Sequence, residues 1–178
     1  MNFVKEFPVN DAICIYRNAL ADELCDEIVQ LFKLEQTQTH VDATTGMTYY
    51  GASSGMHLLS PDSQETNGIK TPLDTDVFIS FNKVILDYQQ TFTWLNDCPE
   101  LIDSGYRVNK YVVNKDEYKE HIDGDPWSLA LQGRVIGVVM YLNDVEEGGE
   151  TFFPLQNVAI KPVKGSIAMF PANWTHPH

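Results

Sequence analysis

The chain has 178 residues, of which 43% are hydrophobic and 11% aromatic, values typical of one folded globular domain. Its 12 basic and 25 acidic side chains give a net charge of −13. Such an acidic surface repels nucleic-acid phosphates, so a DNA- or RNA-binding function is disfavoured. The sequence has no apolar run of about 18 residues, so we expect no membrane-spanning helix.

Three cysteines, Cys14, Cys25 and Cys98, are spaced too widely for a zinc motif or a redox pair. The first residues lack the apolar core of a secretion signal. We therefore expect reduced thiols and a cytoplasmic protein. The sequence carries no signal for an oligomeric state.

Two amphipathic helices are predicted in the first half of the chain. Residues 11–17 read as a short strand, and apolar residues then recur at helical spacing from Leu20 to Phe32. A second, longer helical pattern runs from Val77 to Leu95 and is expected to end near Asn96. Because a β-rich half follows from Gly105 onward, the order of elements predicts an α+β fold.

Residues 36–72 separate the two helical patterns and are rich in Thr, Ser, Gly, Asp and Asn. The stretch is too long for a simple connection. It is interpreted either as short edge strands or as a mobile lid over a site. His40 and His57 lie in this stretch without a partner in a recognisable metal motif, so we expect surface histidines there.

A candidate metal site lies in the β-rich half, at His121 and Asp123. Residues two apart in an extended segment point to the same side, so one strand can aim both side chains at one ion. The terminal Thr175-His176-Pro177-His178 offers a third ligand, and either histidine fits by spacing. Two histidines and one carboxylate with open positions form the ligand set of non-haem Fe(II) oxygenases.

Several motifs accompany these residues in a fixed order. They are Tyr111, Tyr118, His121-x-Asp123, Tyr141-Leu-Asn143, Gly148-Gly-Glu-Thr-x-Phe-Pro154, Lys164-Gly165 and the terminal histidines. Over about residues 105–178 the chain resembles a 2-oxoglutarate- and Fe(II)-dependent dioxygenase of the prolyl 4-hydroxylase-like group, of a viral or bacterial type.

The resemblance implies Fe(II), 2-oxoglutarate and O2 as cofactors, with ascorbate as a further candidate. The implied reaction hydroxylates a peptidyl side chain, with proline as the first choice, and releases succinate and CO2. His121, Asp123 and His178 are then the catalytic iron ligands, with His176 as the alternative third ligand. Tyr111 and Tyr141 are expected to line the 2-oxoglutarate pocket. The partner is a peptide or protein substrate.

The implied fold is a double-stranded β-helix, or jelly roll, with the N-terminal helices packed outside. We expect one domain over residues 1–178, with a helical preface over about 1–104 and the core over about 105–178. In the family, a final strand carries a basic residue that pairs with the far carboxylate of 2-oxoglutarate. The given sequence ends before that position, so we expect this strand and its cation to be missing. Lys110, Arg134 and Lys161 are internal alternatives.

The same residues allow alternatives to this function. A cupin-like metal-binding β-barrel, acting as an isomerase or sugar-binding module, fits the ligands but predicts no consumption of 2-oxoglutarate. A zinc hydrolase is disfavoured because His-Glu-x-x-His and the deaminase signature are absent. A nucleic-acid dealkylase on the same fold conflicts with the acidity of the chain.

Overall fold

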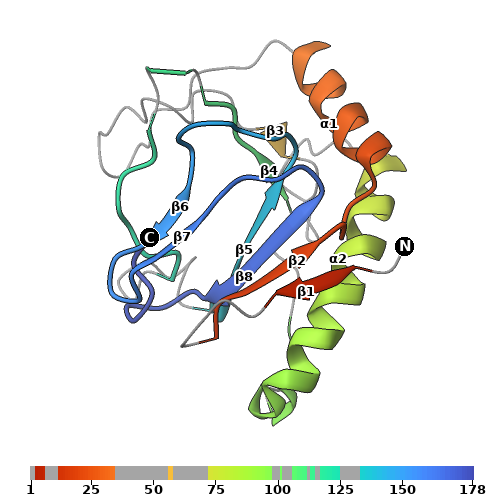
Figure 1. Cartoon of the computed structure of the whole chain (residues 1–178). Helices are drawn as coiled ribbons and strands as arrows, with labels where there is room; N and C mark the ends of the chain where they lie inside the picture. Colours follow the sequence, from red (N-terminus) through yellow and green to blue (C-terminus); the bar gives the residue numbers. More distant parts are fainter. Residues whose placement is uncertain are drawn as a thin grey trace.

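The computed structural model describes residues 3–6, 12–34, 56–57, 72–97, 101, 106–111, 113–114, 117–124 and 133–178. Its elements in chain order are β1 (Val4–Glu6), β2 (Cys14–Arg17), α1 (Asp22–Leu34), β3 (Met56–His57), α2 (Pro72–Thr91), the 3-10 helix η1 (Thr93–Asp97), β4 (Arg107–Val108), β5 (Ile136–Tyr141), β6 (Thr151–Phe153), β7 (Val158–Ile160) and β8 (Ser166–Pro171). Figure 1 shows helices, a central sheet and a hairpin as successive layers.

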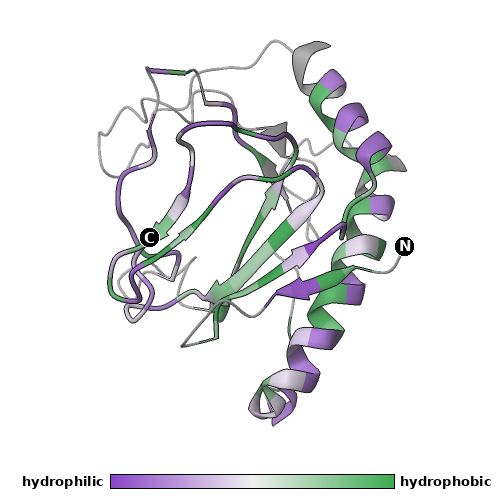
Figure 2. Cartoon of the chain, in the orientation of Figure 1, coloured by the Kyte–Doolittle hydropathy of each residue, from purple (hydrophilic) through white to green (hydrophobic). Residues whose placement is uncertain are grey.

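The central sheet is antiparallel and has the strand order β1-β2-β8-β5. Strand β8 comes from the end of the chain and β2 from its beginning, so Met169 pairs with Cys14 on one side and Val138 on the other. Every residue of β8 before Pro171 is buried. Figure 2 shows that β5 and β8 are hydrophobic along most of their length. The N-terminal strand is therefore part of the same sheet as the β-rich half.

The two helices cover one face of this sheet (Figure 1). Successive side chains of a strand alternate between faces, so β2 turns Cys14 and Tyr16 toward the helices. Apolar residues of both helices join them in one core cluster, among them Leu24, Ile28, Val77, Val84 and Tyr88. Burial of such side chains stabilises the fold by about 1.5–3 kcal/mol each. The helices thus pack against the face of the sheet that carries Cys14 and Tyr16.

The start of α1 is tied to the turn before β8. The backbone nitrogens of Ala19 and Leu20 both donate to the carbonyl oxygen of Gly165, at 2.8 and 2.9 Å. Gly165 has a φ of +75°, and a Cβ there would lie 2.7 Å from the Leu20 oxygen. Only glycine combines this backbone conformation with so close an approach.

The β6–β7 hairpin covers the other face of the sheet (Figure 1). Phe153 of β6 and Ile160 of β7 pack there against Ala168 and Phe170 of β8. The rings of Phe153 and Phe170 meet edge to face, with their centroids 4.9 Å apart. This second core cluster separates the hairpin from the sheet and forms the interior that the candidate site adjoins.

The two expected helices are present, but the second ends earlier than its apolar pattern. The α-helical part of α2 stops at Thr91, and η1 continues the chain to Asp97. Of residues 36–72, the structure describes only β3 and the first residue of α2, so His40 and both interpretations of this stretch lie outside the described residues. His57 lies in β3, where it pairs with Arg107 of β4.

Candidate metal centre

His121 and His178 come from two segments that lie side by side and antiparallel. The backbone nitrogen of His121 donates to the His178 oxygen at 2.9 Å, and the nitrogen of His178 donates back to the His121 oxygen at 3.0 Å. Three residues after His121, the backbone nitrogen of Gly124 donates to the carbonyl oxygen of Ala172 at 2.6 Å. A Cβ on Gly124 would lie 2.9 Å from that same oxygen, so glycine permits the close approach.

Residues 117–124 carry this pairing without forming a regular strand, contrary to the expectation for His121 and Asp123. The chain bends at Asp123 and Gly124. The bend does not separate the two side chains, because the backbone is hydrogen-bonded to residues 172–178 at His121, before the bend, and at Gly124, within it.

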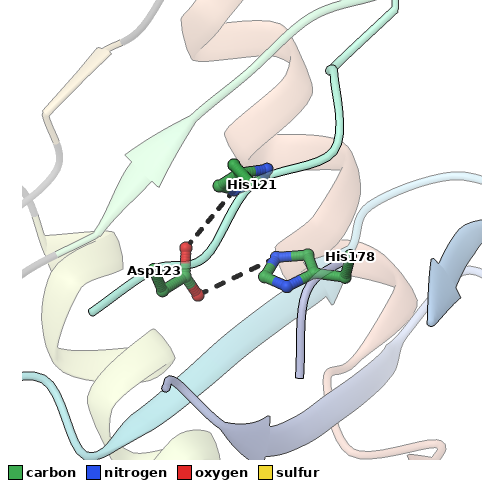
Figure 3. A group of neighbouring side chains, drawn as sticks. All are labelled: His121, Asp123 and His178. Atoms are coloured by element: carbon green, nitrogen blue, oxygen red, sulfur yellow. Dashed lines mark ion pairs between the residues drawn. The ribbon is translucent and has the colours of Figure 1, made fainter. Parts of the chain in front are cut away.

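Three potential ligand groups converge at this point (Figure 3). One oxygen of Asp123 lies 3.5 Å from His121 Nε2, and the other lies 4.0 Å from His178 Nε2. Ligand atoms of all three residues lie within 4.8 Å of one another, and no other such group occurs among the described residues. The structure therefore brings together His121, Asp123 and His178 from opposite parts of the β-rich half.

Hydrogen bonds to the backbone fix which ring nitrogen faces the centre. His121 Nδ1 lies 2.9 Å from the Lys119 carbonyl oxygen, and His178 Nδ1 lies 3.1 Å from the His176 oxygen. A carbonyl oxygen only accepts, so each Nδ1 carries the hydrogen. In the neutral rings each Nε2 then presents a lone pair toward Asp123. Such bonds behind a ligand are what orients histidine on a metal.

The electrostatics of the centre favour a cation. Burial acts to raise the pKa of Asp123, but its contact with His121 and the charges of His178, His121 and Arg134 outweigh burial, so the pKa lies below the ordinary value. Burial lowers the pKa of His178, against the opposing effect of its bond to the His176 oxygen. At neutral pH the centre thus combines a carboxylate with a neutral imidazole, the protonation states that metal binding needs.

Aromatic rings surround the two histidines. The ring of His178 packs against Phe153 and Phe170, at centroid distances of 5.4 and 4.6 Å. Tyr118, one of the residues of the resemblance, stacks on His121 at 4.3 Å. Packing of this kind limits the rotation of the two imidazoles.

Gly137 of β5 lies directly beneath the carboxylate. A Cβ built on it would lie 2.6 Å from Asp123 Oδ2 and 2.3 Å from a ring carbon of Phe170. The absence of a side chain at this position therefore provides the space in which the carboxylate lies.

The other candidate residues lie apart from His121, Asp123 and His178. Tyr141 is on the same face of β5 as Gly137, about 13 Å further along the strand. Its hydroxyl donates to Thr151 Oγ1 at 2.8 Å. The Tyr111 side chain is exposed at 45%. His176 is buried, and its ring centroid lies 6.3 Å from that of Phe153. The group of convergent ligand atoms does not include it.

Arg17 was not singled out from the sequence, yet it lies beside Tyr141. Its Nη1 donates to the buried Ser166 Oγ at 3.2 Å, and Ser166 pairs with Tyr141 across the sheet. Burial raises the pKa of Tyr141 to about 12, and the charge of Arg17 acts in the opposite direction. The internal cations expected from the sequence, Lys110, Arg134 and Lys161, all have exposed side chains.

Comparison with known proteins supports what the geometry indicates. The sequence profile of the 2OG-Fe(II) oxygenase superfamily matches residues 106–178. Probable prolyl 4-hydroxylase 10 of Arabidopsis thaliana is 30% identical over 144 residues, which cover 79% of this chain and 44% of that protein. Probable prolyl 4-hydroxylase 7 of the same plant is 27% identical over 183 residues, covering 89% of this chain and 52% of that protein. The chain spans about half the length of the curated relatives that it matches.

Among solved structures, a viral collagen prolyl hydroxylase from Paramecium Bursaria Chlorella virus-1, in its 2OG complex, shares the fold. The TM-score is 0.64 at 18% identity, covering 91% of this chain and 78% of that one. A truncated form of the same viral protein gives a TM-score of 0.60.

Over residues 106–178, which carry the two imidazoles and the carboxylate, the chain is similar to proteins of the 2OG-Fe(II) oxygenase superfamily. Its sequence relatives and the viral structure make it prolyl 4-hydroxylase-like. The cofactors of this class are Fe(II) and 2-oxoglutarate. No helix in the described part of the chain is both long and apolar enough to cross a membrane.

Proposed function

We propose that this protein hydroxylates a peptidyl side chain, with proline as the target, using Fe(II), O2 and 2-oxoglutarate and releasing succinate and CO2. One observation carries the proposal: two imidazole lone pairs and a carboxylate converge within 4.8 Å. All three are electron-pair donors, and the Nδ1 hydrogens of the two imidazoles point away to backbone oxygens. Such groups repel one another unless a cation lies between them, so the donor set fits Fe(II).

Each residue of the centre has a distinct part in this proposal. His121 and His178 bind the ion through Nε2, and Asp123 binds it through its carboxylate. Lys119 and His176 contribute their backbone oxygens, which hold the rings in the binding tautomer. The His176 side chain is not a ligand. When bound, iron and 2-oxoglutarate supply the oxidising chemistry that no side chain can.

The far carboxylate of 2-oxoglutarate needs polar partners in a buried position, because an unpaired buried charge is costly. Tyr141 and Arg17 lie on the interior side of the sheet at the end away from Gly137. A hydroxyl and a guanidinium are strong donors to a carboxylate. We assign the far carboxylate to these two residues. Tyr111, the other tyrosine of the resemblance, is exposed, and we place it at the entrance of the proposed 2-oxoglutarate pocket.

The complete fold that we propose is a jelly roll with the helices outside, forming one domain over residues 1–178. The layered arrangement of sheet and hairpin supports it, as does the likeness to the viral structure. The pairing of β2 with β8 supports a single domain, because the N-terminal segment completes the sheet of the β-rich half.

The test is succinate formation with Fe(II) and 2-oxoglutarate across a panel of proline-containing peptides, with the hydroxylated residue located by mass spectrometry. His121→Ala and Asp123→Asn should abolish turnover that depends on the peptide. Leu86→Ala, an exposed change on α2, is the matched control and should keep it. Tight metal binding without any consumption of 2-oxoglutarate would contradict the proposal and favour a cupin-like barrel.

A further inference from the structure

The residues just before His178 form a hydrogen-bonded turn. The backbone nitrogen of His176 donates to the Asn173 carbonyl oxygen at 3.0 Å, and that of Thr175 donates to Asn173 Oδ1, also at 3.0 Å. The Thr175 hydroxyl lies 2.5 Å from the same Oδ1 and 2.8 Å from His176 Nδ1. One hydroxyl group therefore links the side chains of Asn173 and His176, and we call this series of hydrogen bonds the hydroxyl relay.

The direction of each bond in the hydroxyl relay follows from its donors and acceptors. Because Asn173 Oδ1 accepts from the Thr175 backbone nitrogen, the atom that faces Thr175 is the amide oxygen, which cannot donate. The Thr175 hydroxyl must then donate its single hydrogen to Oδ1, and it accepts from His176 Nδ1. The relay therefore places a hydrogen on His176 Nδ1 and holds that ring against the turn.

The hydroxyl relay ends at the residue that orients His178. The carbonyl oxygen of His176 accepts from His178 Nδ1 at 3.1 Å, and the Nε2 of that ring lies toward Asp123 (Figure 3). The direction of this carbonyl depends on the backbone of His176, whose side chain is held by the relay and is buried. Because Pro177 follows, His176 is restricted to extended conformations, and Pro177 has no N–H with which to form a competing bond.

The β6–β7 hairpin holds the same turn from outside. In the turn between these strands, Gln156 Nε2 donates to the Thr175 carbonyl oxygen at 2.9 Å. The ring centroid of Phe153 lies 6.3 Å from that of His176 and 5.4 Å from that of His178. The hairpin thus anchors the turn, and the Thr175 hydroxyl connects the side chains within it.

We propose that Asn173, Thr175 and His176 are positioning residues for the metal centre, because the hydroxyl relay holds the His176 carbonyl oxygen where it orients the ring of His178. None of these three side chains binds the metal. The proposal rests on the proposed function, since it takes His178 to be a ligand. A break in the relay should change metal affinity and coordination geometry although all three ligands are still present.

The experiment is anaerobic calorimetry with Mn(II) on the full chain, together with the visible absorption spectrum of the Co(II) form. Thr175→Val keeps the shape of the side chain and removes its hydroxyl. Mn(II) affinity should fall about threefold to tenfold, no more than the lower end of the about 10- to 100-fold that follows loss of a direct partner of a ligand. The Co(II) bands should shift, because they report how the ligands are arranged. Thr175→Ser keeps a hydroxyl and should restore both properties.

Thr91→Val is the matched control. The Thr91 hydroxyl also takes part in two hydrogen bonds, since it accepts from Lys5 Nζ at 2.6 Å and donates to the Asp87 carbonyl oxygen at 3.1 Å, but it lies at the end of α2. Its loss should lower stability toward urea, as the loss of the Thr175 hydroxyl does, and should leave Mn(II) affinity and the Co(II) spectrum unchanged.

Two further variants test the hydroxyl relay from its ends. Asn173→Ala removes the acceptor at the exposed end and should reproduce the metal defect of Thr175→Val, so it decides the question if Thr175→Val does not fold. The double variant Thr175→Val, His176→Ala should bind Mn(II) no more weakly than the weaker of the two single variants, because both changes break the same series of bonds.

Wild-type Mn(II) affinity in both Thr175→Val and Asn173→Ala would overturn the proposal, and so would an equal loss in Thr175→Ser, which keeps the hydroxyl. Absence of Mn(II) binding to the wild type would overturn it together with the proposed function. Metal affinity that depends on the hydroxyl, in a protein that never forms succinate, would support the positioning role and contradict the proposed function. Peptide-dependent succinate formation with metal affinity insensitive to these changes would do the reverse.

Discussion

His121 and His178, separated by 56 residues of sequence, exchange both of their backbone hydrogen bonds, at 2.9 and 3.0 Å. In antiparallel pairing this is the hydrogen-bonded pair, in which two residues directly oppose each other. The two imidazoles are consequently placed side by side, with ring centroids 4.5 Å apart, before any metal binds. The backbone therefore places two of the proposed ligands, and Asp123, the third, comes from the same segment as His121.

The first prediction concerns the identity of the ligands. His121→Ala and His178→Ala should each weaken Mn(II) binding by more than the about 10- to 100-fold that changes behind a ligand cause. His176→Ala should weaken it by less than about tenfold, because His176 is not part of the group of convergent ligand atoms. Anaerobic calorimetry measures all three. Loss of metal in His176→Ala with retention in His178→Ala would show that the assignment is reversed.

The second prediction tests the cation for 2-oxoglutarate. Arg17→Gln should weaken 2-oxoglutarate binding to the Mn(II) form about tenfold, since a hydrogen bond to a charged group is worth about 1.5–3 kcal/mol. Arg17→Lys should recover part of the loss. Lys161→Gln serves as the control, because Lys161 is an exposed cation after β7. Unchanged affinity in Arg17→Gln would assign the far carboxylate to another residue.

The third prediction follows from a buried thiol in the central sheet. Burial raises the pKa of Cys14 from 9.0 to about 11. Between these pH values the unfolded chain has lost the proton and the folded chain keeps it, so the free energy of unfolding falls as pH rises. At pH about 10 the loss should be about 1.4 kcal/mol relative to neutral pH.

Urea unfolding at several pH values measures this dependence. Cys14→Ser has a similar volume and does not titrate in this range, so its stability should fall less steeply above pH about 9. Absolute stabilities will differ between the two proteins, and the slope with pH is the quantity to compare. Parallel slopes would show that Cys14 does not carry the effect.

Much of the candidate site is visible in the sequence because it depends on local spacing. His121 and Asp123 are two residues apart, and their side chains converge even though the segment is not a regular strand. The helical periods likewise predict α1 and α2. These features arise from short-range geometry, which a single sequence contains.

The choice between His176 and His178 cannot be made from spacing, because the alternation rule of strands does not apply there. Asn173 Oδ1 accepts from the backbone nitrogen of Thr175, and the Asn173 carbonyl accepts from that of His176. The first of these bonds is that of an Asx-turn, in which the Asn173 side chain accepts the hydrogen bond that a backbone carbonyl accepts in an ordinary turn. The turn directs the two histidine rings to different surroundings.

Arg17 could not be assigned from the sequence for a different reason. It reaches Ser166 across 149 residues. Its position beside Tyr141 depends on tertiary contacts that no local pattern encodes.

The last prediction concerns Gly137, where the space above the backbone holds the Asp123 carboxylate. Gly137→Ala would bring a methyl group 2.6 Å from Asp123 Oδ2 and 2.3 Å from Phe170, distances that require both side chains to move. Overpacking of this kind costs about 1–3 kcal/mol of stability. Because the displaced carboxylate is a proposed ligand, Mn(II) affinity should fall as well, beyond what the loss of stability alone explains.

Gly133→Ala is the matched control for this change. A Cβ at Gly133 meets no atom within 4 Å, and its φ is not in the left-handed region. The substitution should be neutral or stabilise by about 0.4–1 kcal/mol through the unfolded state. Urea unfolding and Mn(II) calorimetry on both variants separate the two effects. Gly137→Ala with wild-type metal affinity would mean that Asp123 tolerates displacement, and that the carboxylate is not held in place by the space over β5.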